Sequence, residues 1–371
     1  MVDSPQRILI VQPSWVGDAV MATPALRAIR ELYPQAHISY LLRRYVKPIY
    51  AGMPWADRLI TYRTGKTSKK AGRGGAFRLA ARLRKGKFDL AILLPNSFRT
   101  AALMKLARIP RVVGYDRDGR GFLLTDRLLP YRERGRFVPT PMVKTYLGIA
   151  HYLGSPMRDL SLRLFVTPAE RIEAEALLER VGLDRQSARP GAQGAGPWVI
   201  LNAGAQYGAA KCWLPEYFAA VSDRLVDELG ATVFISGSPR ERPIIAEIQR
   251  HTKRPTIDLA SAGMSLGALK EVVRRCDLMI TNDTGPRHIA AAMDVPVVTI
   301  FGPTHPDWTQ IYFEKERQVM VKVFCGPCQK KKCPLDHRCM TRLTPAMVFD
   351  AAAGLLGRPS APGLHVLAKP G

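Results

Sequence analysis

Short apolar runs alternate with segments of helical spacing through most of the chain. In the first half, Arg7–Pro13, Ile38–Leu42 and Asp89–Pro95 predict strands, and Thr23–Tyr33 predicts a helix with Pro24 in its first turn. In the second half the predicted strands are Trp198–Gly204, Ala231–Gly237, Leu278–Asn282 and Val295–Gly302, and the predicted helices are Leu214–Leu229, Ser265–Arg275 and Gly285–Met293. Continuous apolar strands flanked by helices are typical of parallel sheets that are covered on both faces.

The composition predicts where the two halves are joined. Gln186–Pro197 is rich in Gly, Ala and Pro and has no apolar period, which is typical of a flexible connector. We therefore expect one α/β domain at residues 1–185, a linker at 186–197 and a second α/β domain at 198–357. Two such domains leave a cleft between them at the carboxyl ends of their strands, where ligands of open α/β sheets bind.

Two further helices are predicted from their first residues. Thr167-Pro168-Ala169-Glu170 is a capping box with Pro at the first helical position, so a helix is expected from there to about Gly182. Thr344-Pro345 begins the last helix, at residues 344–357, and residues 358–371 have the composition of a poorly ordered tail.

Asp18 is the first candidate for chemistry. It lies in Ser14-Trp15-Val16-Gly17-Asp18, which we expect to be the loop between the first strand and the first helix. Such a loop faces the ligand cleft of a parallel sheet, where a carboxylate can act as a general base. An aspartate in a turn also commonly serves only backbone amides, so the position alone leaves both interpretations open.

Lys211 follows the first strand of the second half, in the small-residue loop Asn202–Trp213. Small residues let backbone N–H groups approach an anion, and a lysine supplies a point charge to a phosphate. The spacing of a Walker loop is absent, and a solvated loop lysine is the alternative.

The segment Thr281–Ala292 is the most specific of the three. A predicted strand ends at Asp283 and a helix begins directly at Thr284-Gly285, so free N–H groups and the positive helix end point out of the sheet. A diphosphate can dock there without a metal ion. Asp283 is expected to orient neighbouring groups or a ribose hydroxyl, and His288 is either a donor to the ligand or a packed histidine.

Three segments carry a family resemblance: SWVGDAVMATPALRAIRELYP from Ser14, LLPNSFRTA from Leu93 and TNDTGPRHIAAAMDVPVVTIFGPTHP from Thr281. With them the chain resembles the bacterial lipopolysaccharide heptosyltransferases from roughly Arg7 to Leu356, and most of all the heptosyltransferase II subfamily. The resemblance implies the GT-B fold, in which two Rossmann-like domains with parallel sheets face each other across a cleft. It implies transfer of heptose from ADP-heptose to the heptose–Kdo inner core of lipid A, with inversion and without a catalytic metal or other cofactor.

The resemblance also implies roles for single residues. Asp18 matches the catalytic base, and Lys211 matches the lysine on the phosphates of the sugar donor. Glu241 matches a carboxylate that contacts the ribose or the sugar. Asp283, Thr284, Gly285 and His288 match the loop that binds the diphosphate and heptose. The base of the nucleotide is expected near Leu259 and Met264, for which core packing is the ordinary alternative.

Four of the six cysteines are clustered: Cys325, Cys328, Cys333 and Cys339. Four thiols have the count of a tetrahedral zinc site, so a structural metal is one interpretation. Their gaps do not match a familiar zinc ribbon, and four reduced thiols are the other interpretation.

The formal charge of +24 is concentrated in the first half, where residues 1–185 hold 33 basic and 15 acidic residues. Arg58–Lys87 contains eleven basic residues and no acidic one, and its middle, Gly65–Gly75, is expected to be a mobile loop. Either this is a solvated surface or it attracts phosphorylated lipid A and the anionic inner membrane.

A nucleic-acid partner is not expected, because the aromatic residues are scattered and no nucleic-acid module is recognisable. No apolar run is long enough to span a bilayer and no signal-peptide pattern is present. We expect a monomer that is cytoplasmic and peripheral at the inner face of the inner membrane. The alternative activity is that of a GT-B glycosyltransferase with a different nucleotide sugar.

Overall fold

The computed structural model describes residues 4–62, 74–183 and 196–357. These residues form two compact units. Unit 1 comprises the described residues up to Phe165 together with Asp307–Ile311, and unit 2 runs from Val166 to Pro306 and onward from Tyr312. Each unit is built around a six-stranded parallel sheet, as the apolar runs predict.

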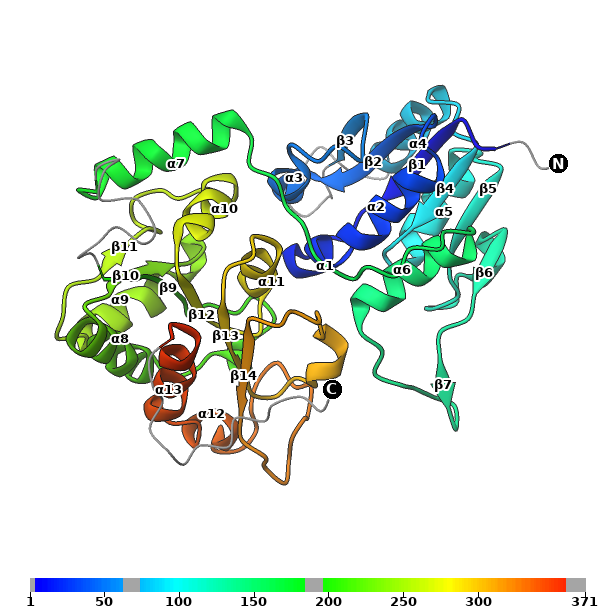
Figure 1. Ribbon diagram of the computed structural model, residues 1–371. Coiled ribbons are helices and arrows are strands. Elements are labelled where there is room, and N and C mark those ends of the chain that lie inside the picture. The colour runs from blue at the N-terminus through cyan, green and yellow to red at the C-terminus, as the bar shows by residue number, and fades with distance from the viewer. Residues whose placement is uncertain (1–3, 63–73, 184–195, 358–371) are drawn as a thin grey trace. The chain divides into compact units, whose positions relative to one another are not determined.

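The sheet of unit 1 has the strand order β3-β2-β1-β4-β5-β6 (Figure 1). Its strands are β1 Arg7–Val11, β2 His37–Arg43, β3 Arg58–Tyr62, β4 Leu90–Leu93, β5 Arg111–Tyr115 and β6 Asp126–Leu128. The helices are α1 Val16–Met21, α2 Thr23–Leu32, α3 Lys47–Tyr50, α4 Gly74–Lys85, α5 Phe98–Leu106 and α6 Met142–Tyr152. A small antiparallel hairpin, β7 Arg132–Glu133 and β8 Arg136–Phe137, follows the last strand of the sheet.

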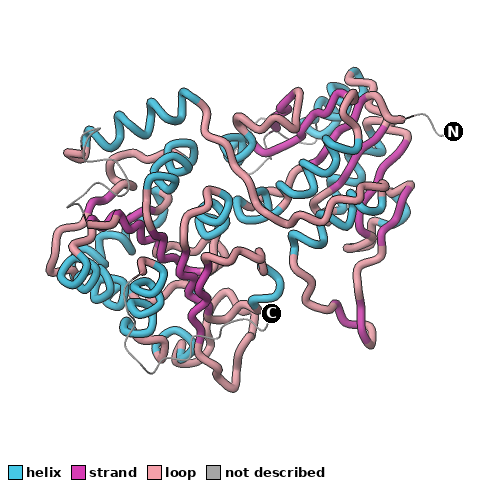
Figure 2. The backbone as a smooth tube through the Cα atoms, viewed as in Figure 1, coloured by secondary structure: helices cyan, strands magenta, loops and turns pink. Residues whose placement is uncertain are grey.

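Unit 2 repeats the same order as β11-β10-β9-β12-β13-β14. Its strands are β9 Trp198–Asn202, β10 Thr232–Ser236, β11 Ile257–Asp258, β12 Leu278–Asn282, β13 Val297–Phe301 and β14 Glu316–Met320. Its helices are α7 Pro168–Arg180, α8 Pro215–Leu229, α9 Arg242–His251, α10 Leu266–Arg275, α11 Gly285–Ala292, α12 Arg338–Thr341 and α13 Pro345–Leu355. Figure 2 shows the strands of each sheet in magenta with helices in cyan beside them.

The central strands are buried along their whole length and mostly apolar, because both of their faces are covered. Every residue of β9, β12 and β13 is buried. In unit 1, α2 packs with α6 and α4 packs with α5, and in unit 2 α8 packs with both α9 and α13. In both units the strand order reverses beside the first strand, at β1–β4 and at β9–β12. This is the point at which doubly wound sheets bind ligands.

The division between the units falls earlier than the predicted boundary at residue 185. The capping box that the sequence predicts is present, because Thr167 and Glu170 exchange side-chain and backbone hydrogen bonds at the start of α7. This helix packs on α10, and the buried ammonium of Lys270 lies 2.9 Å from the carboxylate of Glu170. The helix α7 is therefore the first element of unit 2. The predicted linker, except for its last two residues, lies outside the described residues.

Two other predictions fall on chain that the structure does not describe, namely most of the loop Gly65–Gly75 and the tail 358–371. The described chain resumes with the helix α4 at Gly74. In the described part of the chain, no helix is both long and apolar enough to cross a bilayer.

Candidate active site

In unit 2, loops at one edge of the sheet carry the predicted ligand-binding residues. Because all six strands are parallel, the loops after β9, β10, β11 and β12 leave the sheet at its carboxyl edge. These loops carry Lys211, Glu241, Met264 and the segment Asp283–His288, respectively. The first and last of these loops follow β9 and β12, between which the strand order reverses.

Asp283 is the centre of a buried ionic network. Its Oδ2 accepts hydrogen bonds from Nζ of Lys211 at 2.7 Å and from the hydroxyl of Thr304 at 2.9 Å. Its Oδ1 lies 3.2 Å from Nη1 of Arg287. Arg287 in turn donates to both carboxylate oxygens of Glu316 on β14. The network holds two cations against two anions inside unit 2, so its members keep one another fixed.

The charge state of Asp283 follows from these partners. Burial alone raises the pKa of a carboxyl group, but the positive charges of Lys211 and Arg287 outweigh it and hold the pKa of Asp283 well below its usual range. An ammonium group has three N–H donors, and one of those of Lys211 is donated to Asp283. Lys211 is therefore oriented by a fixed anion and retains donors for a second one.

The helix α11 begins directly after Asp283. Thr284 is its N-cap in an extended conformation, and the side chain of Thr284 makes no capping hydrogen bond. The N–H groups of the first turn, from Gly285 onward, therefore give an electropositive end next to Lys211. His288 is buried, and its Nδ1 has no hydrogen-bond partner among the described residues. Burial and the charge of Arg287 lower the pKa of His288 to about 3, so the ring is neutral near pH 7.

Glu241 lies against the loop after β9. One of its carboxylate oxygens accepts the backbone N–H of Ser238 at 2.6 Å, which closes a capping box. A Cβ on Gly204 would lie 1.9 Å from the other oxygen, so only glycine permits this approach. The carboxylate is thereby held over the loop that leads to Lys211.

The two residues expected near the nucleotide base differ in exposure. Leu259 is fully buried, which is core packing, whereas Met264 is partly exposed. The backbone N–H of Met264 donates to the carbonyl of Leu259 and closes the loop between them. Of the pair, Met264 is the one whose side chain a ligand can reach.

In unit 1, Asp18 lies in the first turn of the short helix α1 and not in a loop as predicted. The six residues of α1 are too few for a helical period to be recognised in the sequence. The hydroxyl of Tyr146, on α6, donates to Oδ1 of Asp18 at 3.0 Å. Burial and the charge of Asp18 raise the pKa of Tyr146 well above its usual value, so Tyr146 remains a donor.

Other buried polar groups lie at this end of the unit 1 sheet. Neither amide atom of Gln12, which follows β1, has a partner among the described residues, and the same is true of the hydroxyl of Tyr50. Buried polar groups of this kind are usually satisfied by water or a ligand. The guanidinium of Arg120 is buried and donates to the carbonyls of Pro95 and Tyr115 and to the side chain of Asn96. It joins the loops after β4 and β5.

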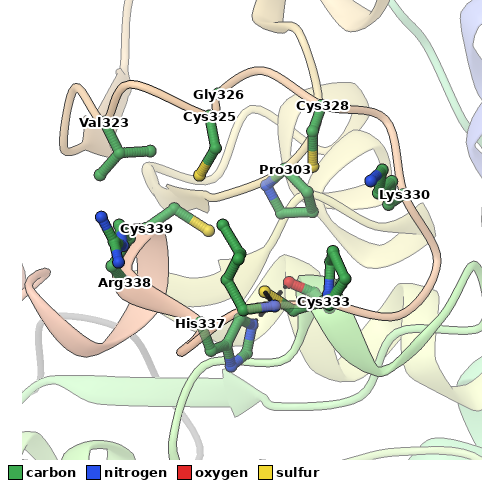
Figure 3. A pocket seen from close by; sticks show the side chains of 13 residues that line it. Pro303, Val323, Cys325, Gly326, Cys328, Lys330, Cys333, His337, Arg338 and Cys339 are labelled. Carbon is green, nitrogen blue, oxygen red and sulfur yellow. Dashed lines mark hydrogen bonds between the residues drawn. The ribbon is translucent and has the colours of Figure 1, made fainter.

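The four clustered thiols line one cavity of about 80 Å³ (Figure 3). Burial and the neighbouring thiols raise the pKa of Cys339 to about 11, so this residue is not a thiolate at pH 7. Within residues 4–62, 74–183 and 196–357, no three Cys, His, Asp or Glu side chains form a group that could hold a metal ion. The structural metal that was one interpretation of Cys325, Cys328, Cys333 and Cys339 is therefore not supported.

Several residues of the two sites were not predicted from the sequence. Arg287 lies inside the most specific motif, where its role was not assigned, and Glu316 lies in a polar strand without any motif. Tyr146 is 128 positions from Asp18 along the chain, and no pattern connects the two. Each of these residues contacts another side chain of the site. Contacts between residues that are distant along the chain produce no recognisable pattern in the local sequence.

Two Rossmann-like units with the same strand order, each with polar loops at one sheet edge, have the architecture of the GT-B fold. The profile of "Glycosyltransferase family 9 (heptosyltransferase)" matches residues 76–338, and the chain belongs to this family. It is therefore a glycosyltransferase enzyme of the heptosyltransferase family, and its relatives include lipopolysaccharide heptosyltransferases.

Similar proteins cover almost the whole chain. Lipooligosaccharide heptosyltransferase 2 of Haemophilus influenzae is 29% identical over 95% of this chain and 99% of its own. Lipopolysaccharide heptosyltransferase 2 of Escherichia coli K12 is 28% identical over 94% and 98%. The solved structure of the E. coli ADP-heptose LPS heptosyltransferase II has a TM-score of 0.76 and 25% identity, and covers 94% of this chain and 98% of its own.

Proposed function

We propose that the protein transfers heptose from ADP-L-glycero-β-D-manno-heptose to the heptose–Kdo inner core of lipid A, with inversion at the anomeric carbon. Membership of the family supports heptosyl transfer, and similarity to the heptosyltransferase 2 proteins supports this acceptor. The observation that carries the proposal is the placement of Lys211, held by Asp283, beside the uncapped amino end of α11. Such a site suits the diphosphate of a nucleotide sugar.

In this mechanism Asp18 takes the proton of the acceptor hydroxyl as that oxygen forms its bond to the anomeric carbon. The bond from that carbon to the diphosphate breaks, and ADP leaves with the electron pair. Lys211 and the N–H groups at Thr284–Gly285 offset the charge that develops on the diphosphate. Neutral His288 donates to the heptosyl diphosphate, and Glu241 contacts the ribose or sugar. The adenine lies near Met264.

The partners are proposed on the same basis. We assign the acceptor to unit 1 and the nucleotide sugar to unit 2. The basic segment Arg58–Lys87, of which the structure describes both ends, would attract the anionic inner-membrane surface from the cytoplasmic side. A monomer suffices for this reaction.

A screen of sugar donors tests the function. ADP-heptose, UDP-glucose and GDP-mannose are each titrated into the protein by calorimetry, and turnover is followed with heptosylated Kdo₂-lipid A. We expect binding and transfer with ADP-heptose only. A preference for the UDP or GDP sugar would identify instead a GT-B glycosyltransferase with another donor.

Tyr146→Phe is expected to slow transfer roughly tenfold or more without changing the affinity for ADP-heptose. The change removes a phenol that donates to Asp18, and hydrogen bonds to charged groups contribute about 1.5–3 kcal/mol. Single-turnover rates measure the effect. Tyr152→Phe, at the exposed end of the same helix, is the matched control. An unchanged rate in Tyr146→Phe would show that this hydrogen bond does not position Asp18.

A further inference from the structure

The hairpin of unit 1 exposes several apolar side chains to solvent. In this segment, Leu129–Phe137, no residue is buried, and Leu129, Tyr131 and Phe137 are 79%, 62% and 37% exposed. Figure 1 shows the β7 end of this ribbon extending away from the six-stranded sheet. Two-stranded hairpins are at best marginally stable alone in water, so a surface that covers these side chains would stabilise the segment.

The hairpin nevertheless has a defined shape. Arg132 pairs with Phe137 and Glu133 pairs with Arg136 across the two strands. The turn between them is made by Arg134 and Gly135, both with positive φ (47° and 77°), as tight two-residue hairpin turns require. The exposed tip is therefore a regular two-residue turn, and Arg134 lies in it.

The charge of the hairpin is strongly positive. Between residues 127 and 137, four arginines (Arg127, Arg132, Arg134 and Arg136) face a single acidic residue, Glu133, which accepts a hydrogen bond from Tyr131. None of the four forms a salt bridge with any residue in the described part of the chain. Their counter-ions must therefore come from outside the described residues.

A fifth arginine stacks on the hairpin from the loop after β5. The guanidinium carbons of Arg117 and Arg132 lie 4.0 and 4.2 Å from the ring centroid of Phe137. The buried Nε of Arg117 has no hydrogen-bond partner within the described residues. The aromatic ring thus holds two cations close together, where their mutual repulsion is relieved when an anion binds.

We propose that the hairpin Leu129–Phe137 is a docking element for an anionic lipid bilayer. Its arginines contact lipid phosphates, and Leu129 and Tyr131 enter the interfacial layer of the membrane. Charged and aromatic side chains of this kind, with apolar bodies and polar ends, favour the bilayer interface. A surface that recognises only sugar phosphates would gain no binding energy from an exposed leucine. The exposed Leu129 therefore favours a bilayer over a soluble anion as the partner.

The position of the hairpin in unit 1 suggests what contact with a bilayer would do. Because the sheet of unit 1 is parallel, β6 leaves it at the same edge as β1, so the hairpin and the Asp18 segment follow strand ends of one edge. Bilayer contact at this edge would bring a lipid-linked acceptor to the Asp18 side of unit 1; this last step alone rests on the proposed function.

Sedimentation of the full chain with vesicles tests the proposal without any acceptor. Vesicles of phosphatidylcholine are compared with vesicles that also contain phosphatidylglycerol. We expect binding only to the latter, and about 30-fold weaker binding for the pair Arg132→Gln with Arg134→Gln. The pair Leu129→Ser with Tyr131→Ser is also expected to bind several-fold more weakly.

The pair Arg250→Gln with Lys253→Gln removes the same charge from exposed positions of unit 2 and is expected to bind as the unchanged protein does. Arg78→Gln with Arg82→Gln tests the separate contribution of the basic segment. Each variant is also checked for ADP-heptose affinity, which should not change. If neither the unchanged protein nor any variant binds ADP-heptose, the proposed function is wrong. The conclusion from vesicle binding does not depend on that result.

Insertion is measured with Tyr131→Trp in vesicles whose acyl chains carry bromine near the headgroups. We expect more fluorescence quenching than in the unchanged protein. The proposal is overturned if the hairpin pairs bind vesicles as tightly as the unit 2 control pair, or if Tyr131→Trp adds no quenching. Weakened transfer to a water-soluble acceptor, with vesicle binding unchanged, would instead assign the hairpin to the saccharide.

Discussion

Asp18→Asn is expected to reduce heptosyl transfer by about a thousandfold while ADP-heptose binds with unchanged affinity. A general base contributes on the order of 10²–10⁴ in rate, and the amide that replaces the carboxylate cannot take the proton of the acceptor. The shape of the site is kept because the amide oxygen still accepts the hydroxyl of Tyr146. Single-turnover transfer and calorimetric titration of ADP-heptose separate the two effects.

Asp118→Asn is a matched control in the same unit. Asp118 is exposed and has positive φ (56°), a conformation that asparagine tolerates well. We expect it to transfer heptose at the normal rate. If Asp18→Asn also keeps a rate near normal, another group is the base and the assignment of Asp18 is wrong.

Asp283→Leu is expected to lower the free energy of unfolding of unit 2 by about 3–5 kcal/mol and to abolish detectable binding of ADP-heptose. The change removes the anion between Lys211 and Arg287 and leaves a buried ammonium without its counter-charge. Because the pKa of Asp283 is held below that of the unfolded chain, the carboxylate stabilises the fold above roughly pH 4 and loses this effect on acidification. Urea unfolding is therefore compared at neutral pH.

The double variant Lys211→Met with Asp283→Leu separates folding from binding. It removes both charges of the pair, while Arg287 keeps its two contacts with Glu316. We expect it to recover much of the lost stability but not the affinity for ADP-heptose. If the double variant is no more stable than Asp283→Leu, the unpaired buried ammonium of Lys211 is not what destabilises the single variant.

The sequence predicts the repeated elements well because each of them has a strong local signal. The strand Leu278–Asn282 is found at the predicted residues, and the predicted helix Leu214–Leu229 starts one residue later, at Pro215. The helix at Thr167 was expected from the capping box alone, and both of its hydrogen bonds are present. Membership of the glycosyltransferase family was likewise expected from three short segments and is confirmed.

The features that were missed depend on contacts between distant residues. The boundary between the units was placed at the Gly-rich segment by composition, whereas it is the packing of α7 on α10 that decides it. The number of cysteines in the cluster suggests a metal site, but neither their number nor their spacing determines where the sulfur atoms lie. The predicted contacts of Lys211, Glu241, Met264 and His288 with a ligand remain predictions for the experiments above.

The membership of α7 and of Asp307–Ile311 has a consequence for synthesis on the ribosome. Domains generally fold in order as they emerge. Here Glu170 is made a hundred positions before Lys270, its buried partner, so the apolar face of α7 must wait for the rest of its unit. Unit 1 in turn receives Asp307–Ile311 only after most of unit 2 has been translated. Neither unit can therefore complete its contacts before Asp307–Ile311 and the residues from Tyr312 onward have been translated.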